Sequence, residues 1–285
     1  MHYVGLSRVR NSCSLHVLNL NEKKIKVRDK VKNEMNRLRT EAILKPLAVL
    51  QVNIDSPQTK TVLFHNVRSL HLHIHDVRTD YNIQKADVNI FVETKLCLSD
   101  RDDTYQLPGF SLYRNDFNQS NIRTSYGTAV YIKNDLNCTE IPYRFNTNDV
   151  EISVTVLGHP VPNFHIVGIY RSKIVRISQF IEALTHLHNS VLMKPTIPVV
   201  LLGDFNINLM QDGTEQKALK AFLITNKGYT QLINQYTTDY RTQIDHIYTN
   251  VPHLLQSAGT LESYYSDHKP IFMSLTSLET LTLSS

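Results

Sequence analysis

The sequence predicts a layered α/β or α+β domain, in which helices cover the outside of a sandwich of β-sheets. Short apolar runs rich in valine, isoleucine and leucine recur between residues 61 and 275, and each has the length of a buried strand. Only a few segments between them show the three- and four-residue spacing of apolar side chains that is typical of a helix. Strands interleaved with few, long helices favour this architecture.

The individual elements follow from the same patterns. Strands are expected at 61–66, 88–93, 127–132, 151–157, 164–170, 199–204, 244–248 and 271–275. A helix is expected after the first strand, through Tyr81 and Ile83. Two more are expected at 174–192, before Pro195, and at 215–226, where Gly228 is suited to end a helix.

Length and composition indicate a soluble globular protein. The 285 residues suffice for one large domain or two modest ones, and 41% of them are hydrophobic. No apolar run approaches the ~20 residues of a membrane helix, so no membrane partner is expected. Three widely spaced cysteines, Cys13, Cys97 and Cys138, favour reduced thiols in an intracellular compartment over disulfides or a zinc site.

Charge is unevenly distributed along the chain. The net charge of +4 combines +7 in residues 1–60, from 12 Lys/Arg and 5 Asp/Glu, with −3 in residues 61–285, from 18 Lys/Arg and 21 Asp/Glu. A slightly acidic domain therefore follows a basic segment. That domain cannot bind nucleic acid through bulk charge alone and needs a local basic rim or a bound cation.

Three regions are expected along the chain: 1–59, 60–277 and a polar tail at 278–285. Within the first region, residues 22–47 are charged, and apolar side chains recur at helical spacing from Val27 to Leu38. This pattern fits a solvated helix with one docking face or, alternatively, a DNA-binding arm. Pro57 lies in a segment of linker composition.

Polar residues of catalytic type close several predicted strands. They are Asn66, Glu93, Tyr170 and Asp204, and Asp267-His268 immediately precede the last strand. A buried carboxylate is costly unless it is paired or metal-bound, so acids at several strand ends predict a site where those ends meet. Glu93 and Asp267 are hard oxygen donors suited to Mg²⁺, although each alone could also be a helix cap or a salt-bridge acid.

Two further acids have positions suited to proton transfer. Asp204 and Asn206 alternate around Phe205, so in an extended segment they face the same side. One could handle a proton while the other donates a hydrogen bond to a phosphoryl oxygen, but the same segment could also be a turn. Asp245 lies inside an apolar strand, where its natural partner is a histidine, and His268 could be that partner.

The conjunction of motifs resembles the endonuclease/exonuclease/phosphatase family, the fold of DNase I and the apurinic/apyrimidinic endonucleases. Six motifs occur in the family's order over roughly residues 61–276. They are Asn66-Val67-Arg68-Ser69-Leu70, Val92-Glu93-Thr94, Gly168-Ile169-Tyr170-Arg171, Gly203-Asp204-Phe205-Asn206, Ile244-Asp245-His246-Ile247 and Ser266-Asp267-His268-Lys269-Pro270-Ile271. The resemblance implies a four-layer sandwich of two packed mixed β-sheets flanked by helices.

The resemblance also implies which residues contact the metal and the phosphate. Asn66 and Glu93 would organise Mg²⁺, or Mn²⁺, with Glu93 the principal ligand and Asp267 a second one. Tyr170 would contact the scissile phosphate. The metal would neutralise charge on the non-bridging oxygens.

The remaining matching residues would carry out hydrolysis. Asp204 would position or deprotonate the attacking water, and Asn206 would steady the phosphate. Asp245 would orient His268, which would contact the phosphoryl oxygen or transfer a proton. In-line attack of water, as in the family's nucleases, would leave a 5′-phosphate and a 3′-hydroxyl.

Within the family, the first and the last two motifs look like endonucleases of non-LTR retrotransposons. DNA is therefore the expected partner and the nucleus the expected location. Those enzymes usually carry Pro-Thr-Arg before Ile-Asp-His, whereas this chain has a shortened segment at 235–241. Substrate contacts near this segment are not carried over, although no catalytic position is lost.

The N-terminus resembles a different family. Residues 3–10, with Leu15 and His16, are similar to the last motif of superfamily-1 DNA helicases carried by Helitron transposons, in which the arginine matching Arg8 would contact a γ-phosphate. No Gly-Lys-Ser/Thr phosphate loop occurs in the sequence, so no ATP partner is expected. The simplest account is a C-terminal fragment of a helicase–endonuclease polyprotein, or a reading frame begun at an internal Met1.

Several alternatives stay open. The same fold could act as a phosphatase on inositol phosphates, lipids or nucleotides, or the chain could be an inactive transposon-derived fragment. The alternating His71, His73 and His75 fit a solvated helix surface or a zinc site. Tyr264 and Tyr265 could line a groove, where tyrosines stack on bases, or could pack in the interior.

Overall fold

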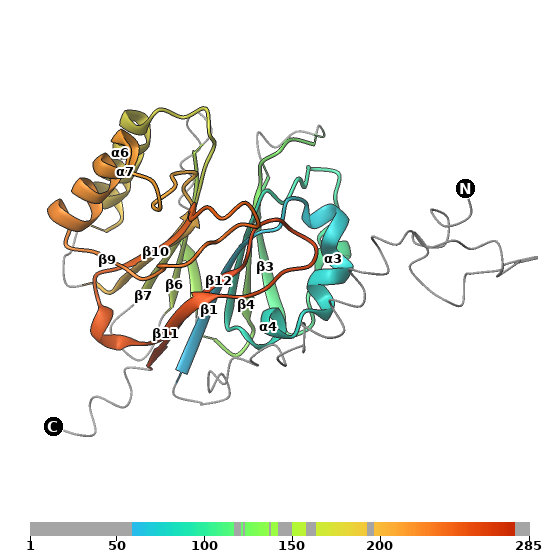
Figure 1. The fold of residues 1–285 in the computed structure, drawn as a ribbon. Helices are drawn as coiled ribbons and strands as arrows, with labels where there is room; N and C mark the ends of the chain where they lie inside the picture. Colours follow the sequence, from blue (N-terminus) through green and yellow to red (C-terminus); the bar gives the residue numbers. More distant parts are fainter. Residues whose placement is uncertain are drawn as a thin grey trace, which may run out of the picture. The chain divides into compact units, whose positions relative to one another are not determined.

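Two six-stranded sheets pack face to face and form the body of the domain (Figure 1). The computed structural model describes residues 59–116, 121, 123–136, 138–141, 150–157, 164–192 and 197–276. The expected helicase-like motif, the basic helix and the polar tail lie outside the described residues. For the described residues, the predicted sandwich of two mixed sheets is confirmed.

Each sheet combines one parallel strand pair with antiparallel neighbours. The first sheet has the order β11 (Leu255–Thr260), β12 (Ile271–Thr276), β1 (Thr59–Asn66), β2 (Val88–Val92), β4 (Thr128–Lys133) and β3 (Phe110–Asn115). The second has the order β5 (Cys138–Ile141), β6 (Val150–Leu157), β7 (Phe164–Arg171), β8 (Val199–Asp204), β10 (Asp245–Thr249) and β9 (Thr230–Gln231). The parallel pairs are β1 with β2 and β7 with β8.

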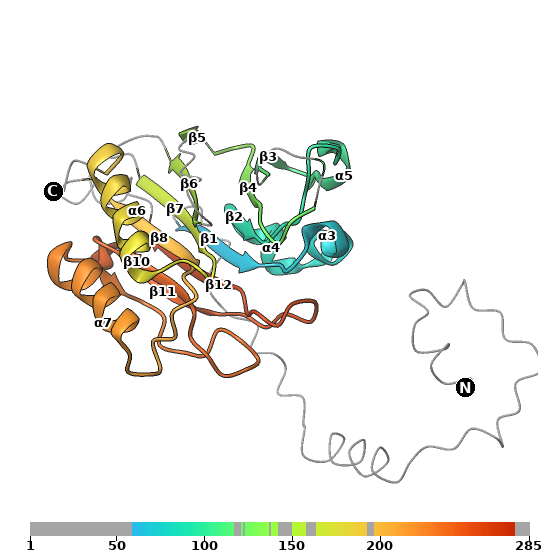
Figure 2. The ribbon, with the colours of Figure 1, turned by 90° about the horizontal axis from the view of Figure 1, so that it is seen from above.

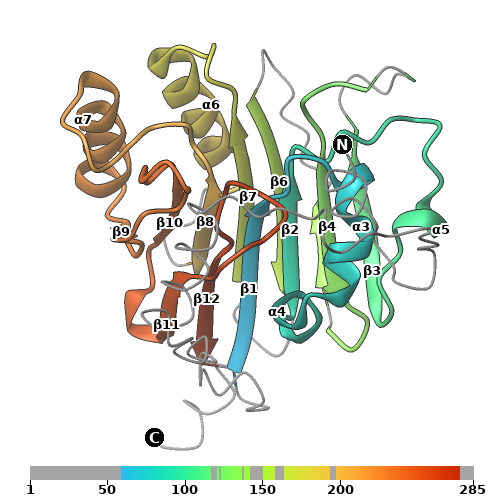
Figure 3. The ribbon, with the colours of Figure 1, turned by 45° about the vertical axis from the view of Figure 1, so that its right-hand side comes forward.

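Helices cover the outer face of each sheet, as the view from above shows (Figure 2). On the second sheet lie α6 (Ile177–Ser190), α7 (Thr214–Lys220) and the π-helical turn η4 (Ala221–Asn226). On the first lie α3 (Leu70–Thr79), α4 (Tyr81–Lys85) and the short α5 (Asp102–Tyr105), with α3 and α4 in front of β2 and β4 in Figure 3. A 3-10 turn, η5 (Pro252–Leu254), precedes β11. None of the helices in the described ranges is long and apolar enough to cross a membrane.

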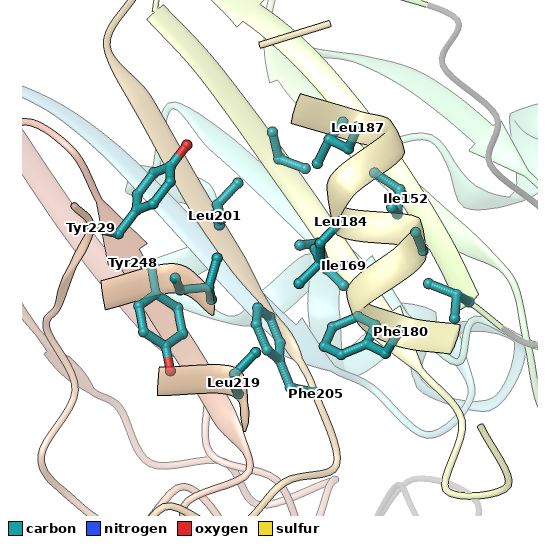
Figure 4. Packing of buried hydrophobic residues seen from close by; sticks show 14 of the residues in the cluster. Ile152, Ile169, Phe180, Leu184, Leu187, Leu201, Phe205, Leu219, Tyr229 and Tyr248 are labelled. Atoms are coloured by element: carbon teal, nitrogen blue, oxygen red, sulfur yellow. The ribbon is translucent and has the colours of Figure 1, made fainter. Parts of the chain in front are cut away.

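Alternation of apolar side chains along the strands produces three buried layers. In β1, Val62 and Phe64 point into the layer between the sheets, whereas Leu63 points into the layer beneath α3. The third layer joins α6 to the second sheet: Leu184 and Phe180 pack against Ile169 (Figure 4). Strands that are buried on both faces read as continuous apolar runs, which is why the sequence pattern located them.

Two predicted helices differ from those observed. The expected helix through Ile83 is interrupted at Asp80, whose extended backbone ends α3 and whose carboxylate accepts hydrogen bonds from the backbone N–H groups that open α4. The helix expected at 174–192 spans only Ile177–Ser190, because residues before it form a turn in which Ile174 is exposed. The helix expected at 215–226 is confirmed as α7 continued by η4, and Gly228 beyond it has a φ of 73°.

Leu184→Ala tests the layer beneath α6. Leu184 is fully buried, so truncation should lower the free energy of unfolding by about 2–5 kcal/mol, from lost apolar burial and the cavity left behind. Urea titration measures the change. The matched control, truncation of the exposed Ile174 to alanine, should change it by no more than about 0.5 kcal/mol. Equal effects of the two substitutions would contradict this packing.

Candidate active site

Polar residues from both sheets meet where the parallel strand pairs end. Asn66 is the last residue of β1, and Glu93 follows the neighbouring β2. Asp204 is the last residue of β8, and Asp245 lies opposite it on β10. The carboxyl ends of parallel strands share one edge of a sheet, so each sheet contributes its own acids to the region between them.

The side-chain amide of Asn66 connects the acids of the two sheets. Its Nδ2 atom donates hydrogen bonds of 2.9 Å to Glu93 Oε1 and of 2.9 Å to Asp204 Oδ2. Its Oδ1 atom accepts one of 3.0 Å from the backbone N–H of Arg68. The amide nitrogen of Asn66, not its carbonyl oxygen, therefore faces the two carboxylates.

Asp245 and His268 form a buried pair, as their residue types indicated. His268 Nδ1 lies 3.0 Å from Asp245 Oδ2 and 3.9 Å from Asp204 Oδ2. A carboxylate can only accept, so Nδ1 carries the proton. Burial opposes the charged imidazole, but Asp245 and Asp204 outweigh it and raise the pKa of His268 to about 9. At neutral pH the ring is an imidazolium held in one orientation.

Asp204 is itself an unusual carboxyl group. Burial, followed by the nearby charge of Asp245, raises its pKa to about 7, against the opposing effects of His268 and Asn66. The backbone N–H of Asn206 also donates to Asp204 Oδ1 at 3.0 Å. A carboxyl group that is partly ionised near neutral pH is suited to accept and release a proton.

The alternation of Asp204 and Asn206 suggested an extended segment, but Asn206 does not lie in one. Its φ is 50°, in the left-handed region, and its side-chain Nδ2 donates a 2.7 Å hydrogen bond to the carbonyl oxygen of Arg171. Residues 205–208 form an irregular loop after β8, so the strand does not continue to Asn206. Arg68 and Glu93 are left-handed too, with φ of 57° and 50°, and such strained non-glycine residues collect at functional sites.

Arg68 has no role in the sequence-based prediction, yet it contacts two of the predicted acids. Its Nε and Nη2 atoms donate to the two carboxylate oxygens of Asp267, both at 2.8 Å, and its Nη1 lies 3.9 Å from Glu93 Oε2. Partial burial opposes ionisation of Asp267, but Arg68 lowers the pKa of this carboxyl below its ordinary value. The only hint in the sequence was the position of Arg68 within the first motif.

Arg171 holds the loop that carries Asn206. Its guanidinium is almost fully buried and donates to the backbone carbonyls of Phe205 at 3.2 Å and Asn206 at 3.3 Å. It also forms an ion pair of 2.7 Å with Glu215 at the start of α7. An arginine directly after the predicted Tyr170 could have been noticed, but nothing local showed which backbone it binds.

His268 is also held through its backbone. The Nε2 atom of His65 lies 2.9 Å from the carbonyl oxygen of His268, so Nε2 is the donor. The Tyr265 hydroxyl, 3.4 Å from His65 Nδ1, then donates to that atom. Burial lowers the pKa of His65 to about 4, so its ring is neutral. Tyr265 is half-buried and packs against His65 and the layer beneath α3, whereas Tyr264 is 73% exposed.

Tyr170 is buried in the layer between the sheets, next to Asp204 in the parallel register. Burial, followed by the charges of Glu93 and Asp204, raises the pKa of its hydroxyl, so the group remains a neutral phenol. Of the helix histidines, His71 bonds the Tyr105 hydroxyl at 2.7 Å and His73 bonds Asp76 at 3.2 Å. Because these histidines have separate partners, they favour the interpretation of a solvated helix surface over a zinc site.

Two groups of side chains could hold a metal ion. Ligand atoms of Asp204, Asp245 and His268 lie within 4.8 Å of one another, but His268 already shares its proton with Asp245 and all three are buried. Glu93 and Asp267 offer only oxygen and adjoin Arg68, which is partly exposed. Mg²⁺ prefers oxygen ligands and keeps several waters, so the donor set of Glu93 and Asp267 fits it better.

Comparison with known proteins identifies a family. Residues 63–268 match the sequence profile of the Endonuclease/Exonuclease/phosphatase family. In the comparison with curated proteins, no sequence matches the chain.

Three of the solved structures that share the fold illustrate the likeness. The endonuclease domain of TRAS1, a telomere-specific non-LTR retrotransposon, has a TM-score of 0.61 at 16% identity, covering 76% of this chain and 98% of that chain. The human Nocturnin catalytic domain with bound sulfate has 0.58 at 15%, covering 77% and 93%. The 3′-5′ exonuclease NExo from Neisseria meningitidis has 0.58 at 18%, covering 76% and 99%.

The ion pair of His268 predicts a pH dependence of stability in the metal-free protein. Because the folded-state pKa is about 9, against 6.5 for an ordinary histidine, the pair's contribution is complete below about pH 6.5 and is lost as pH rises through about 9. Asp245→Asn should therefore lower the free energy of unfolding by about 3 kcal/mol at pH 6 and by much less at pH 9.5.

Urea titrations at several pH values measure this difference. Tyr229→Phe is the matched control, because it removes a buried hydrogen bond between the Tyr229 hydroxyl and His188. Burial raises the pKa of that hydroxyl, so it keeps its proton throughout this pH range. Its effect should be the same at both pH values. A pH-independent loss for Asp245→Asn would contradict the assignment of charge to His268.

Proposed function

Because the chain belongs to the endonuclease/exonuclease/phosphatase family, whose members are nucleases or phosphatases, we propose that it is a Mg²⁺-dependent endonuclease that nicks DNA. The observation that carries the proposal is the Asp245–His268 pair, which lies beside Asp204 and is linked by Asn66 to Glu93. These groups supply a base, a charged hydrogen-bond donor and a metal ligand in one place.

Each residue has a distinct task in the proposed reaction. Asp204 accepts a proton from the attacking water, for which a pKa of about 7 suits it. The water oxygen bonds to phosphorus as the bond to the 3′-oxygen breaks. The leaving 3′-oxygen takes a proton from solvent water, and the products are a 5′-phosphate and a 3′-hydroxyl. The His268 imidazolium, held by Asp245, donates to a phosphoryl oxygen as negative charge develops there.

The other site residues position these groups. Asn66 holds Asp204 and Glu93 in fixed orientations, and Asn206, through its backbone N–H, holds the second oxygen of Asp204. Tyr170, a neutral phenol, offers a hydrogen bond to the scissile phosphate. Glu93, with Asp267, would hold the Mg²⁺, which when bound neutralises charge on the phosphate; Mn²⁺ has the same oxygen preference.

DNA as the substrate is supported by the retrotransposon-type motifs and by the likeness in fold to the TRAS1 endonuclease domain and to NExo. An origin in a mobile element fits the helicase-like motif near Arg8, which lies outside the described residues. We expect no ATP partner and a nuclear location. The family also contains phosphatases, so release of phosphate from inositol phosphates without plasmid nicking would favour that alternative.

The test is nicking of supercoiled plasmid in the presence of Mg²⁺. Wild type should convert it to the open circular form, whereas Asp204→Asn and His268→Gln should each lower the rate at least ~100-fold, the usual contribution of a positioned proton-transfer group. Lys133→Met is the control, since it breaks an ion pair with Asp87 at the opposite end of β2 from Glu93. No nicking by wild type, or nicking by the two site variants at the wild-type rate, would refute the proposal.

A further inference from the structure

Arg68 places a fixed positive charge at the carboxylates proposed as metal ligands. It engages both oxygens of Asp267 at 2.8 Å and lies 3.9 Å from the free oxygen of Glu93. The side chains of Arg68 and Asp267 are 40% and 26% exposed, whereas that of Glu93 is only 9% exposed. The arginine thus reaches from solvent to a carboxylate that is almost entirely removed from water.

The geometry of this contact leaves little room for a second cation. A guanidinium that binds a carboxylate with two parallel hydrogen bonds occupies the lone pairs that a metal would use. A divalent ion between Glu93 and Asp267 would also lie a few ångströms from the guanidinium, and like charges at that distance repel. Left-handed backbone at both Arg68 and Glu93 fixes the two side chains in these positions.

We propose that Arg68 is a built-in counter-cation of the metal site, which competes with the divalent ion for Asp267 and Glu93. Without metal, the guanidinium offsets the repulsion between the two carboxylates and stabilises the fold. When metal binds, the Arg68–Asp267 contact is released. The affinity of the site for metal is therefore set by Arg68 as much as by the ligands. This inference rests on the proposed function for the position of the metal, but not on DNA as the substrate.

The experiment titrates the full-length protein with Mn²⁺ by isothermal calorimetry and records the melting temperature in EDTA. Arg68→Met should bind Mn²⁺ about 2- to 5-fold more tightly than wild type, the size of one exposed ion pair, and should melt at a lower temperature in EDTA. Lys133→Met, which also loses one ion pair to a carboxylate, should melt lower but bind Mn²⁺ like wild type.

A second variant keeps the test decisive if Arg68→Met folds poorly. Arg68→Lys retains the charge without the two-pronged geometry, so its Mn²⁺ affinity should lie between those of wild type and Arg68→Met. An unchanged or weaker affinity in both variants would overturn the role of Arg68. Glu93→Gln should abolish binding; if it does not, the proposed metal position fails, and with it the competition. Mg²⁺-dependent nicking with unchanged affinities would refute the counter-cation while leaving the endonuclease intact.

Discussion

A single amide, that of Asn66, satisfies carboxylates from both sheets, and the candidate site depends on it. Glu93 and Asp204 belong to different sheets and are both buried, so each needs a hydrogen-bond donor where water is excluded. Because the Nδ2 atom of Asn66 donates to both carboxylates, the two sheets must stay close enough at this point for both hydrogen bonds to form. The Asp245–His268 pair is then positioned through Asp204, its neighbour across the strand register.

Much of this could be predicted from the sequence, and for a physical reason. Buried strands read as continuous apolar runs, and the polar residue that ends such a run marks a strand end. Asn66, Glu93 and Asp204 were found in this way, and the partnership of Asp245 with His268 followed from the difficulty of burying an acid alone. The topology of the sheets decides which strand ends lie next to each other. The topology was predicted from the order of the family's motifs rather than from any one motif.

The rest could not be predicted, because it depends on contacts between residues far apart in the chain. Arg68 and Asp267 are 199 positions apart, and no local pattern pairs them. Arg171 binds backbone carbonyls, which carry no sequence signal. The strand β11 lacks a clear apolar alternation and forms only because β12 offers it an edge, while Asp80 divides a helix through a side-chain cap that competes with continued helix.

The place of β12 within the first sheet has a consequence for how the protein is made. It pairs with β1 although the two strands stand at opposite ends of the domain's sequence, and it brings Asp267 and His268 with it. In a chain leaving the ribosome, Asn66 and Glu93 are made long before the histidine is synthesised. Any catalytic activity that needs His268 is therefore absent until translation has passed this residue, and chains that terminate before it lack the Asp245–His268 pair.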